Sequence, residues 1–98
     1  MKVIAKGRQK GKTTQLLYTS ATTGYPILTP TESKCEFLNL EAKKLEIEIP
    51  EPITVGRLIS SRDGGKPRNK ILVDDTEEVL HLLLMYFGYD LQALTVTI

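Results

Sequence analysis

Short apolar runs alternate with segments of helical spacing along this chain, and this alternation strongly limits the folds that it can adopt. The apolar runs cover residues 3–5, 25–28, 53–55, 71–73 and 93–98. Helical spacing of apolar residues follows residue 13, covers about residues 30–45 and returns after residue 75. Strands that are separated by helices pair in parallel through right-handed crossovers. We therefore expect an α/β fold, a three-layer sandwich with a small parallel sheet of four or five strands.

The ends of the helical segments carry local signals. Gly24 and Gly88 stand where a glycine C-cap would end a helix. At the start of the second helix, Thr29 suits the N-cap, Pro30 the first helical position and Glu32 the glutamate of a capping box. The last helical segment is expected to turn one apolar face inward, made of Val79, Leu80, Leu83, Leu84 and Phe87.

Length and composition indicate one small domain over residues 1–98. With 98 residues, of which 41% are hydrophobic, the chain can bury a single core. No stretch approaches the roughly 20 apolar residues that span a bilayer, and the N-terminus does not read as a secretory signal, so we expect a cytoplasmic protein without a membrane partner. The single Cys35 and single His81 can supply neither an intrachain disulfide nor a structural zinc site. Cys35 is expected in the core, and His81 as a structural or surface residue.

The formal net charge of +1 does not by itself indicate nucleic-acid binding, but the charges are unevenly placed. Residues 1–31 contain five lysines and arginines and no carboxylate. A second group of cations lies in a turn-rich segment and is a candidate for contacts with nucleic-acid phosphates: Arg62, Lys66, Arg68 and Lys70. Interleaved aromatic residues are missing there, so an ordinary basic surface loop is the alternative.

A glycine-rich basic loop joins the first apolar run to the first helical segment. Small residues let backbone N–H groups close around a phosphate, and the N-terminus of the helix, expected near Gly11, adds partial positive charge. Lys12 would reach the terminal phosphates of a nucleotide, and the Thr13 hydroxyl would coordinate Mg²⁺. A basic solvated turn is the alternative. The expected nucleotide-binding residues are Gly7, Arg8, Gln9, Lys10, Gly11, Lys12, Thr13 and Thr14.

The spacing of this loop departs from the Walker A pattern, G-x-x-x-x-G-K-[ST]. That pattern requires glycine where Lys6 stands, and Gly7 is one residue late. In this form residues 6–14 resemble the variant phosphate loop of viral large terminases, the ATPase motors that package DNA. The resemblance implies that Arg8 would reach the γ-phosphate and stabilise charge on the transferred phosphoryl group. A solvated loop cation is the alternative for Arg8.

Two carboxylates follow the apolar run 71–73, which has the continuous character of a parallel strand buried on both faces. This segment looks like a Walker B motif of P-loop NTPases, so Asp74 is expected to hold Mg²⁺ together with Thr13. Asp75 stands where related ATPases usually carry the glutamate that orients the attacking water. The alternative makes Asp75 a helix N-cap, with Glu77 and Glu78 as favourable first-turn carboxylates. At the end of the last run, Thr97 fits either a γ-phosphate sensor or an ordinary strand residue.

The residues and the resemblance together predict a minimal P-loop NTPase core that binds ATP and Mg²⁺. The favoured function is a Mg²⁺-dependent ATPase of phage or prophage type acting with DNA or a partner protein, with Lys12, Asp75 and Arg8 as catalytic groups. The alternatives are a non-hydrolytic nucleotide-binding module and a nucleic-acid-binding accessory protein. Because the chain leaves little room beyond such a core, the remaining parts of a motor would come from further copies of the chain or from a partner.

Overall fold

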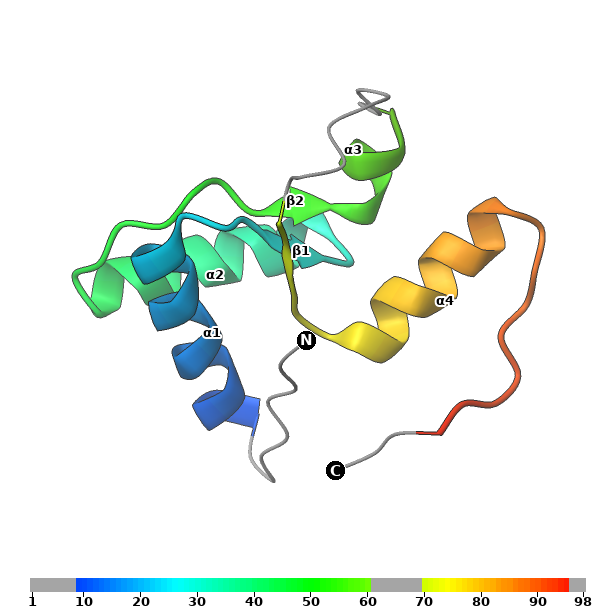
Figure 1. Ribbon diagram of the computed structural model, residues 1–98, viewed down its shortest axis with the longest axis horizontal. Coiled ribbons are helices and arrows are strands. Elements are labelled where there is room, and N and C mark those ends of the chain that lie inside the picture. The colour runs from blue at the N-terminus through cyan, green and yellow to red at the C-terminus, as the bar shows by residue number, and fades with distance from the viewer. Residues whose placement is uncertain (1–8, 61–69, 96–98) are drawn as a thin grey trace.

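The computed structural model describes residues 9–60 and 70–95, and Figure 1 shows the arrangement of their helices and strands. The first half contains helix α1 (Gln9–Thr23), strand β1 (Ile27–Thr29) and helix α2 (Glu32–Lys44). The second half contains β2 (Ile53–Thr54), α3 (Val55–Ser60), β3 (Leu72–Val73) and α4 (Thr76–Tyr86). The expected α/β class is confirmed.

The sheet is parallel and has three strands in the order β2-β1-β3. The prediction of four or five strands is therefore wrong for the part of the chain that the structure describes. The apolar run 3–5 lies outside the described residues, and within the last run residues 93–95 form no strand. In Figure 1 the chain after α4 runs outside the sheet, where it has no neighbouring strand. The β-branched residues of this segment do not by themselves form a strand, because a strand is stabilised by contacts with the side chains and backbone of neighbouring strands.

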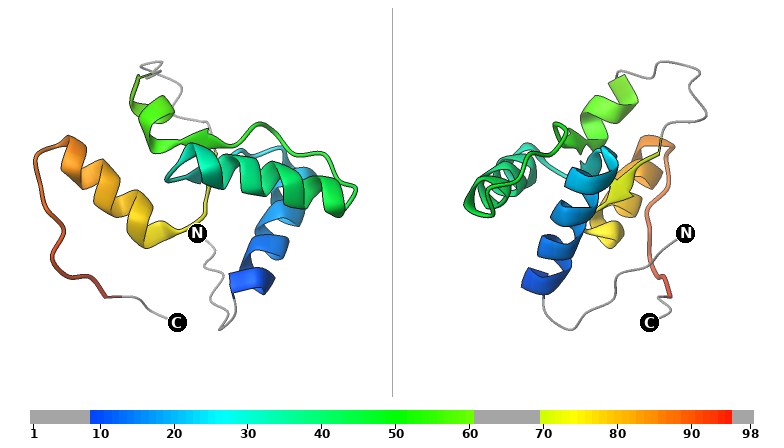
Figure 2. Two further views of the ribbon diagram at one scale, coloured as in Figure 1. Left: turned by 180° about the vertical axis from the view of Figure 1, so that it is seen from behind. Right: turned by 60° about the vertical axis from the view of Figure 1, so that its left-hand side comes forward.

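Helices lie on both faces of the sheet because neighbouring residues of β1 point in opposite directions. Ile27 packs into one core cluster with α1 and α2, and Leu28 into a second with α3 and α4. Figure 2 shows α1 and α2 separated from α4 by the sheet. The buried residues of the first cluster are Leu16, Leu17, Ile27, Leu38 and Ala42, and those of the second are Leu28, Val55 and Val79.

The predicted helix ends at glycine are confirmed. Gly24 has a φ of +78° and Gly88 a φ of +87°, values in the left-handed region that glycine adopts without steric cost. The Gly24 amide donates to the Ser20 carbonyl at 2.9 Å, and the buried Ser20 hydroxyl donates to the Tyr25 carbonyl at 2.7 Å. These bonds end α1 and turn the chain into β1.

The predicted start of the second helix is wrong by two residues. Thr31 is the N-cap of α2, and its hydroxyl accepts from the Lys34 amide at 3.3 Å. Thr29 instead ends β1 and is fully buried. The local sequence allows both positions because threonine precedes both Pro30 and Glu32. Pairing of β1 with both neighbouring strands keeps the chain extended through Thr29.

β3 and α4 are more exposed than their apolar sequences predict. Ile71 and Val73 are 40% and 37% exposed, so β3 is not buried on both faces. On α4 only Val79 is fully buried, and Leu82 and Leu83 pack against its cluster. Leu80 and Phe87, which were expected on the inner face, are exposed. Among the described residues, no helix has the length and apolarity needed to cross a membrane.

Candidate functional site

The carboxyl edge of the sheet gathers the polar residues that follow each strand. Thr29 ends β1, Thr54 ends β2, and Asp74 follows β3. Because the strands are parallel, helices α2, α3 and α4 all begin at this edge and direct their N-termini toward it. Edges of this kind are the usual position of ligand sites in open α/β sheets.

Asp74 is fixed at this edge by the sheet itself. Its backbone amide donates to the carbonyl of Leu28 in β1 at 2.9 Å, and its side chain is half-buried. Burial raises the pKa of Asp74 above its ordinary value, and the positive charges of Lys34 and Lys12 partly offset that effect. The charge of neighbouring Asp75 raises the pKa further. The site therefore holds a carboxylate that is incompletely compensated by the protein.

Asp75 joins β3 to α4 in an unusual backbone conformation. Its φ of 58° and ψ of 59° lie in the left-handed region, which costs a residue other than glycine about 1 kcal/mol. Asp75 occupies the N-cap position of α4, but its side chain makes no capping hydrogen bond. Its Oδ2 instead lies 3.5 Å from Nζ of Lys34 in α2. The alternative that made Asp75 a helix N-cap is thus correct in position, but the side-chain hydrogen bond of an N-cap is not formed. Glu77 and Glu78 occupy the first turn of α4 as expected.

Gly11, Lys12 and Thr13 lie in the first turns of α1, which begins at Gln9. The prediction that the helix begins near Gly11, after a loop, is therefore wrong by two residues. The amides at the start of a helix have no partner within it, so that of Gly11, in the first turn, belongs to the group available to an anion. Thr13 is buried and Thr14 half-buried.

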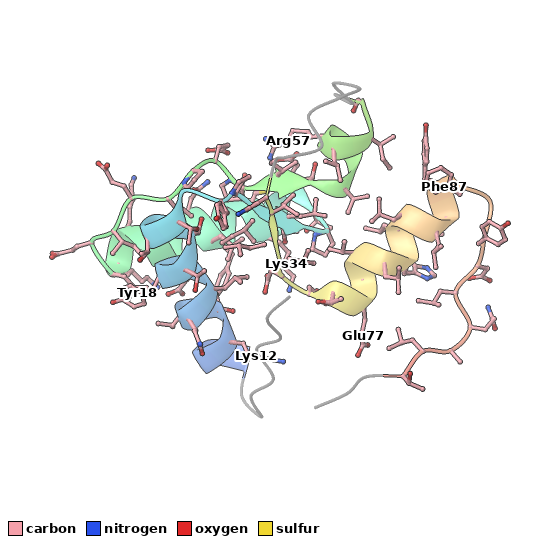
Figure 3. All side chains as sticks on the ribbon, in the orientation of Figure 1. Lys12, Tyr18, Lys34, Arg57, Glu77 and Phe87 are labelled. Carbon is pink, nitrogen blue, oxygen red and sulfur yellow. The ribbon has the colours of Figure 1, made fainter. Side chains whose placement is uncertain are left out.

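Lys12 relates the basic segment to the acidic strand end through its charge, the weakest of the effects that act on Asp74. In Figure 3 its side chain extends from the start of α1 toward the side on which β3 leads into α4. Its charge acts on Asp74, so the two groups lie within electrostatic range although they are far apart in the sequence. Together with Lys34, Lys12 places two cations around the two carboxylates of this edge.

Several predicted site residues lie outside the described residues, namely Gly7, Arg8, Arg62, Lys66, Arg68 and Thr97. Gln9 and Lys10 form the first two positions of α1. Lys70 is exposed, and its Nζ lies 5.7 Å from the ring centroid of Tyr25, within cation–π range.

The sequence did not single out two residues of this edge, Thr29 and Lys34. Thr29 is fully buried, and within residues 9–60 and 70–95 its Oγ1 has no hydrogen-bond partner. The only sequence signal was a polar residue at the end of an apolar strand, and it was interpreted as a helix cap. Lys34 acquires its position from the adjacency of β1 and β3, which places the first turn of α2 beside Asp75.

The oxygen-bearing side chains of this edge suit a hard cation that would also be bound by the phosphate groups of a ligand. Among the described residues no group of three or more His, Cys, Asp or Glu side chains could hold a metal by itself. Mg²⁺ commonly uses one or two protein oxygens and takes its other ligands from phosphate and water. Asp74 and the Thr13 hydroxyl could supply oxygen ligands of this kind, and the incompletely compensated charge of Asp74 would favour a cation.

A separate polar cluster lies at the start of α2 and α3. Arg57 donates through Nε and Nη2 to the two carboxylate oxygens of Glu32, at 3.0 and 3.1 Å. Arg57 Nη2 also donates to Sγ of Cys35 at 3.4 Å. Cys35 is 3% exposed, which confirms the expectation that it belongs to the core. This cluster joins α2 to α3, and none of its members was predicted to act in the site.

Comparison of the chain with protein-family models, with curated proteins and with solved structures gives no significant match.

Proposed function

We propose that this chain is a P-loop type nucleotide-binding protein that holds ATP and Mg²⁺ at the carboxyl edge of its sheet. The first-turn amides of α1 and the Lys12 ammonium would bind the phosphates, and Asp74 and the Thr13 hydroxyl would hold the cation. The proposal depends mainly on one observation: α1 begins on the side of the sheet where β3 leads into α4, so that the Lys12 side chain extends toward that strand end and its charge contributes weakly to the pKa of Asp74. These two residues belong to the two sequence segments that a phosphate loop and an acidic strand end would supply.

The electrostatics of the edge favour a ligand that carries both signs of charge. Burial and the charge of Asp75 raise the pKa of Asp74, which means that its ionised form is destabilised. A divalent cation beside Asp74 would stabilise that ionised form. Lys12 and Lys34 supply the opposite charge that polyphosphate requires. A Mg²⁺–triphosphate complex presents both charges at once.

Hydrolysis is the favoured activity of the proposed site. Asp75 would orient the attacking water, and Arg8 would stabilise the γ-phosphoryl group. Both roles are proposals, since Asp75 is ion-paired with Lys34 and Arg8 lies outside the described residues. An attack that uses the Asp75 carboxylate requires the 3.5 Å ion pair with Lys34 to open.

The same ion pair favours the alternative, a nucleotide-binding module without turnover. Asp75 is shorter by one methylene than the glutamate common at this position, and Lys34 draws its carboxylate toward α2. In this alternative the Mg²⁺–ATP complex binds and is not cleaved. The nucleic-acid alternative keeps only the sequence evidence, because Lys70 is its one member among the described residues.

Nucleotide titration tests the binding proposal. Isothermal calorimetry with ATP should show binding that requires Mg²⁺ and weakens at least tenfold in Lys12→Ala and Asp74→Asn. Lys43→Ala is the matched control, since this exposed lysine lies in the last turn of α2, about 17 Å along the helix from its start. Absence of binding, or equal affinity in all four proteins, would overturn the proposal.

Phosphate release then separates the two activities. Release by the wild type that disappears in Lys12→Ala and in Asp75→Asn supports hydrolysis at this site. Mg²⁺-dependent binding without release supports the non-hydrolytic module. Release that is equal in the wild type and both variants would come from a contaminant and contradict hydrolysis by this chain.

A further inference from the structure

Thr29, the last residue of β1, carries the one buried side-chain polar atom that has no hydrogen-bond partner within residues 9–60 and 70–95. The side chain is fully buried, so its hydroxyl has given up water without gaining a bond to the protein. The next residues offer it no amide, because Pro30 has no N–H group and the Lys34 amide donates to Thr31. The fold therefore leaves a hydrogen-bond donor unused at the carboxyl edge of the sheet.

The face to which Thr29 points follows from the alternation of side chains along β1. Side chains two residues apart in a strand share a face, so Thr29 lies on the side of Ile27, which packs with α1 and α2. On β3, Leu72 is paired with Ile27 and packs against the same cluster. Asp74, two residues after Leu72, is therefore expected on this face as well. The lysines whose charges act on Asp74 belong to α1 and α2, in agreement with that direction.

Thr29 and Asp74 are neighbours across the two strands. The register pairs Leu28 with Val73, and the Asp74 amide donates to the Leu28 carbonyl at 2.9 Å, so the pairing extends as far as Asp74. Thr29 and Asp74 come next in this register, and paired strands lie about 4.8 Å apart. At that spacing, rotation about χ1 can bring a hydroxyl to a carboxylate on the same face. The fold thus places an acceptor beside the unused donor.

We propose that Thr29 is a positioning residue of the cation site, and that its hydroxyl donates to the Asp74 carboxylate when Mg²⁺ binds there. This inference rests on the proposed function. Carboxylates that ligate a metal are commonly held by hydrogen bonds of their own, which fix their orientation. Thr29 supplies such a bond from inside the fold, where water does not compete for it. Without the hydroxyl the carboxylate can turn away from the cation, so the affinity for the cation falls.

Binding of Mn²⁺ tests the proposal, because this ion takes the same oxygen ligands as Mg²⁺ and can be followed by electron paramagnetic resonance. The full chain is titrated in the presence of a non-hydrolysable ATP analogue, so the measurement does not depend on turnover. Thr29→Val keeps the shape of the side chain and should raise the Mn²⁺ dissociation constant by about tenfold or more. Thr29→Ser keeps the hydroxyl and should restore most of the affinity.

Thr54→Val is the matched control. Thr54 is the register partner of Thr29 and is also buried, but its hydroxyl accepts from the Arg57 amide at 3.0 Å. The variant therefore removes the same atom at the same edge of the sheet, and it should leave the Mn²⁺ affinity unchanged. Urea unfolding without ligand checks the fold of each variant. Thr29→Val should be at least as stable as the wild type, so its lower affinity would not come from unfolding.

The possible failures are distinguishable. If Thr29→Val binds Mn²⁺ as tightly as the wild type, the positioning role is refuted and the proposed function stands. An equal loss of affinity in Thr29→Val and Thr54→Val, or no recovery in Thr29→Ser, would show that the affinity follows packing and would also refute the role. A wild type that binds neither Mn²⁺ nor the analogue would overturn this inference together with the proposed function.

Discussion

Thr29 and Thr54 are register partners across β1 and β2, yet only Thr54 has a hydrogen bond for its hydroxyl. The Thr54 hydroxyl accepts from the Arg57 amide at 3.0 Å and so caps α3. Within the described residues Thr29 Oγ1 is buried without a partner. A buried polar atom of this kind costs free energy, and it lies at the sheet edge where we propose that ligand binds.

The two threonines should therefore respond in opposite directions to the same substitution. Thr29→Val removes an unpartnered hydroxyl and keeps the shape of the side chain, so we expect the free energy of unfolding to rise by about 1 kcal/mol. Thr54→Val removes a cap and should lower it by about 1 kcal/mol. Urea unfolding of both variants measures these changes. A loss of stability in Thr29→Val would show that its hydroxyl is bonded in solution.

The burial of Asp74 predicts a pH-dependent gain of stability in Asp74→Asn. Burial raises the pKa of Asp74 in the folded protein above its ordinary value of 3.8, so the folded state binds that proton more tightly than the unfolded chain. The ionised carboxylate thus costs stability above the raised folded-state pKa, and this cost is lost as the pH falls to 3.8. We expect Asp74→Asn to unfold at higher urea concentration than the wild type at neutral pH.

Acidification provides the check on that gain. The difference between the two proteins should shrink as the pH is lowered toward 3.8, where the wild-type carboxylate is increasingly protonated. Asp90→Asn, at an exposed carboxylate, is the control and should not stabilise the protein. A difference that grows on acidification would contradict the assignment, because it would require Asp74 to be stabilised in its charged form.

Two glycines should differ in their response to alanine. Gly24 has a φ of +78° and nothing within 4 Å of an added Cβ, so Gly24→Ala costs only the strain of the left-handed backbone, about 1 kcal/mol. Gly56 lies within α3 and meets only the Thr54 hydroxyl at 3.9 Å, so Gly56→Ala should stabilise the protein by up to about 1 kcal/mol. Thermal unfolding measures both changes. Equal effects of the two substitutions would refute the conformational explanation.

Cys35 should react slowly with alkylating reagents in the folded protein. The side chain is buried, and burial raises the pKa of the Cys35 thiol, an effect that the charge and hydrogen bond of Arg57 partly oppose. The reagent therefore reaches the Cys35 sulfur less easily, and a smaller fraction of this thiol is in the reactive thiolate form. Labelling with iodoacetamide, followed by mass spectrometry, should be at least tenfold slower in buffer than in urea. Equally fast labelling in both conditions would show that the α2–α3 contact opens readily.

Local sequence signals predicted the kind of element well and the exact boundaries less well. Helical spacing over about residues 30–45 correctly predicted α2, and Cys35 lies in its buried face as expected. Local signals placed the N-cap of this helix at Thr29 and not at Thr31, because both threonines have the side chain that caps a helix. The basic segment was interpreted as a loop that leads into a helix near Gly11, whereas α1 already begins at Gln9.

The candidate site was predictable in part. The sequence predicted that the phosphate loop and the acidic strand end face one crevice, and in the structure the charge of Lys12 has a weak effect on the pKa of Asp74. It could not identify Lys34 as the partner of Asp75, since that ion pair depends on the adjacency of β1 and β3. Exposure was also misjudged: Leu80 and Phe87 have the spacing of a buried helix face, but no described element covers them.

The sequence alone determined the helical segments 32–44 and 76–86, the strands around residues 27–29, 53–54 and 72–73, and the glycines that end two helices, but it wrongly predicted a strand at residues 93–95. Periodicity and backbone preference are local properties, so neighbouring residues are sufficient to define them. Only the tertiary structure decided that β1 lies between β2 and β3, that Thr29 is buried without a partner, and that Lys34 meets Asp75. These outcomes depend on contacts between residues distant in the chain, whose energies no local pattern contains.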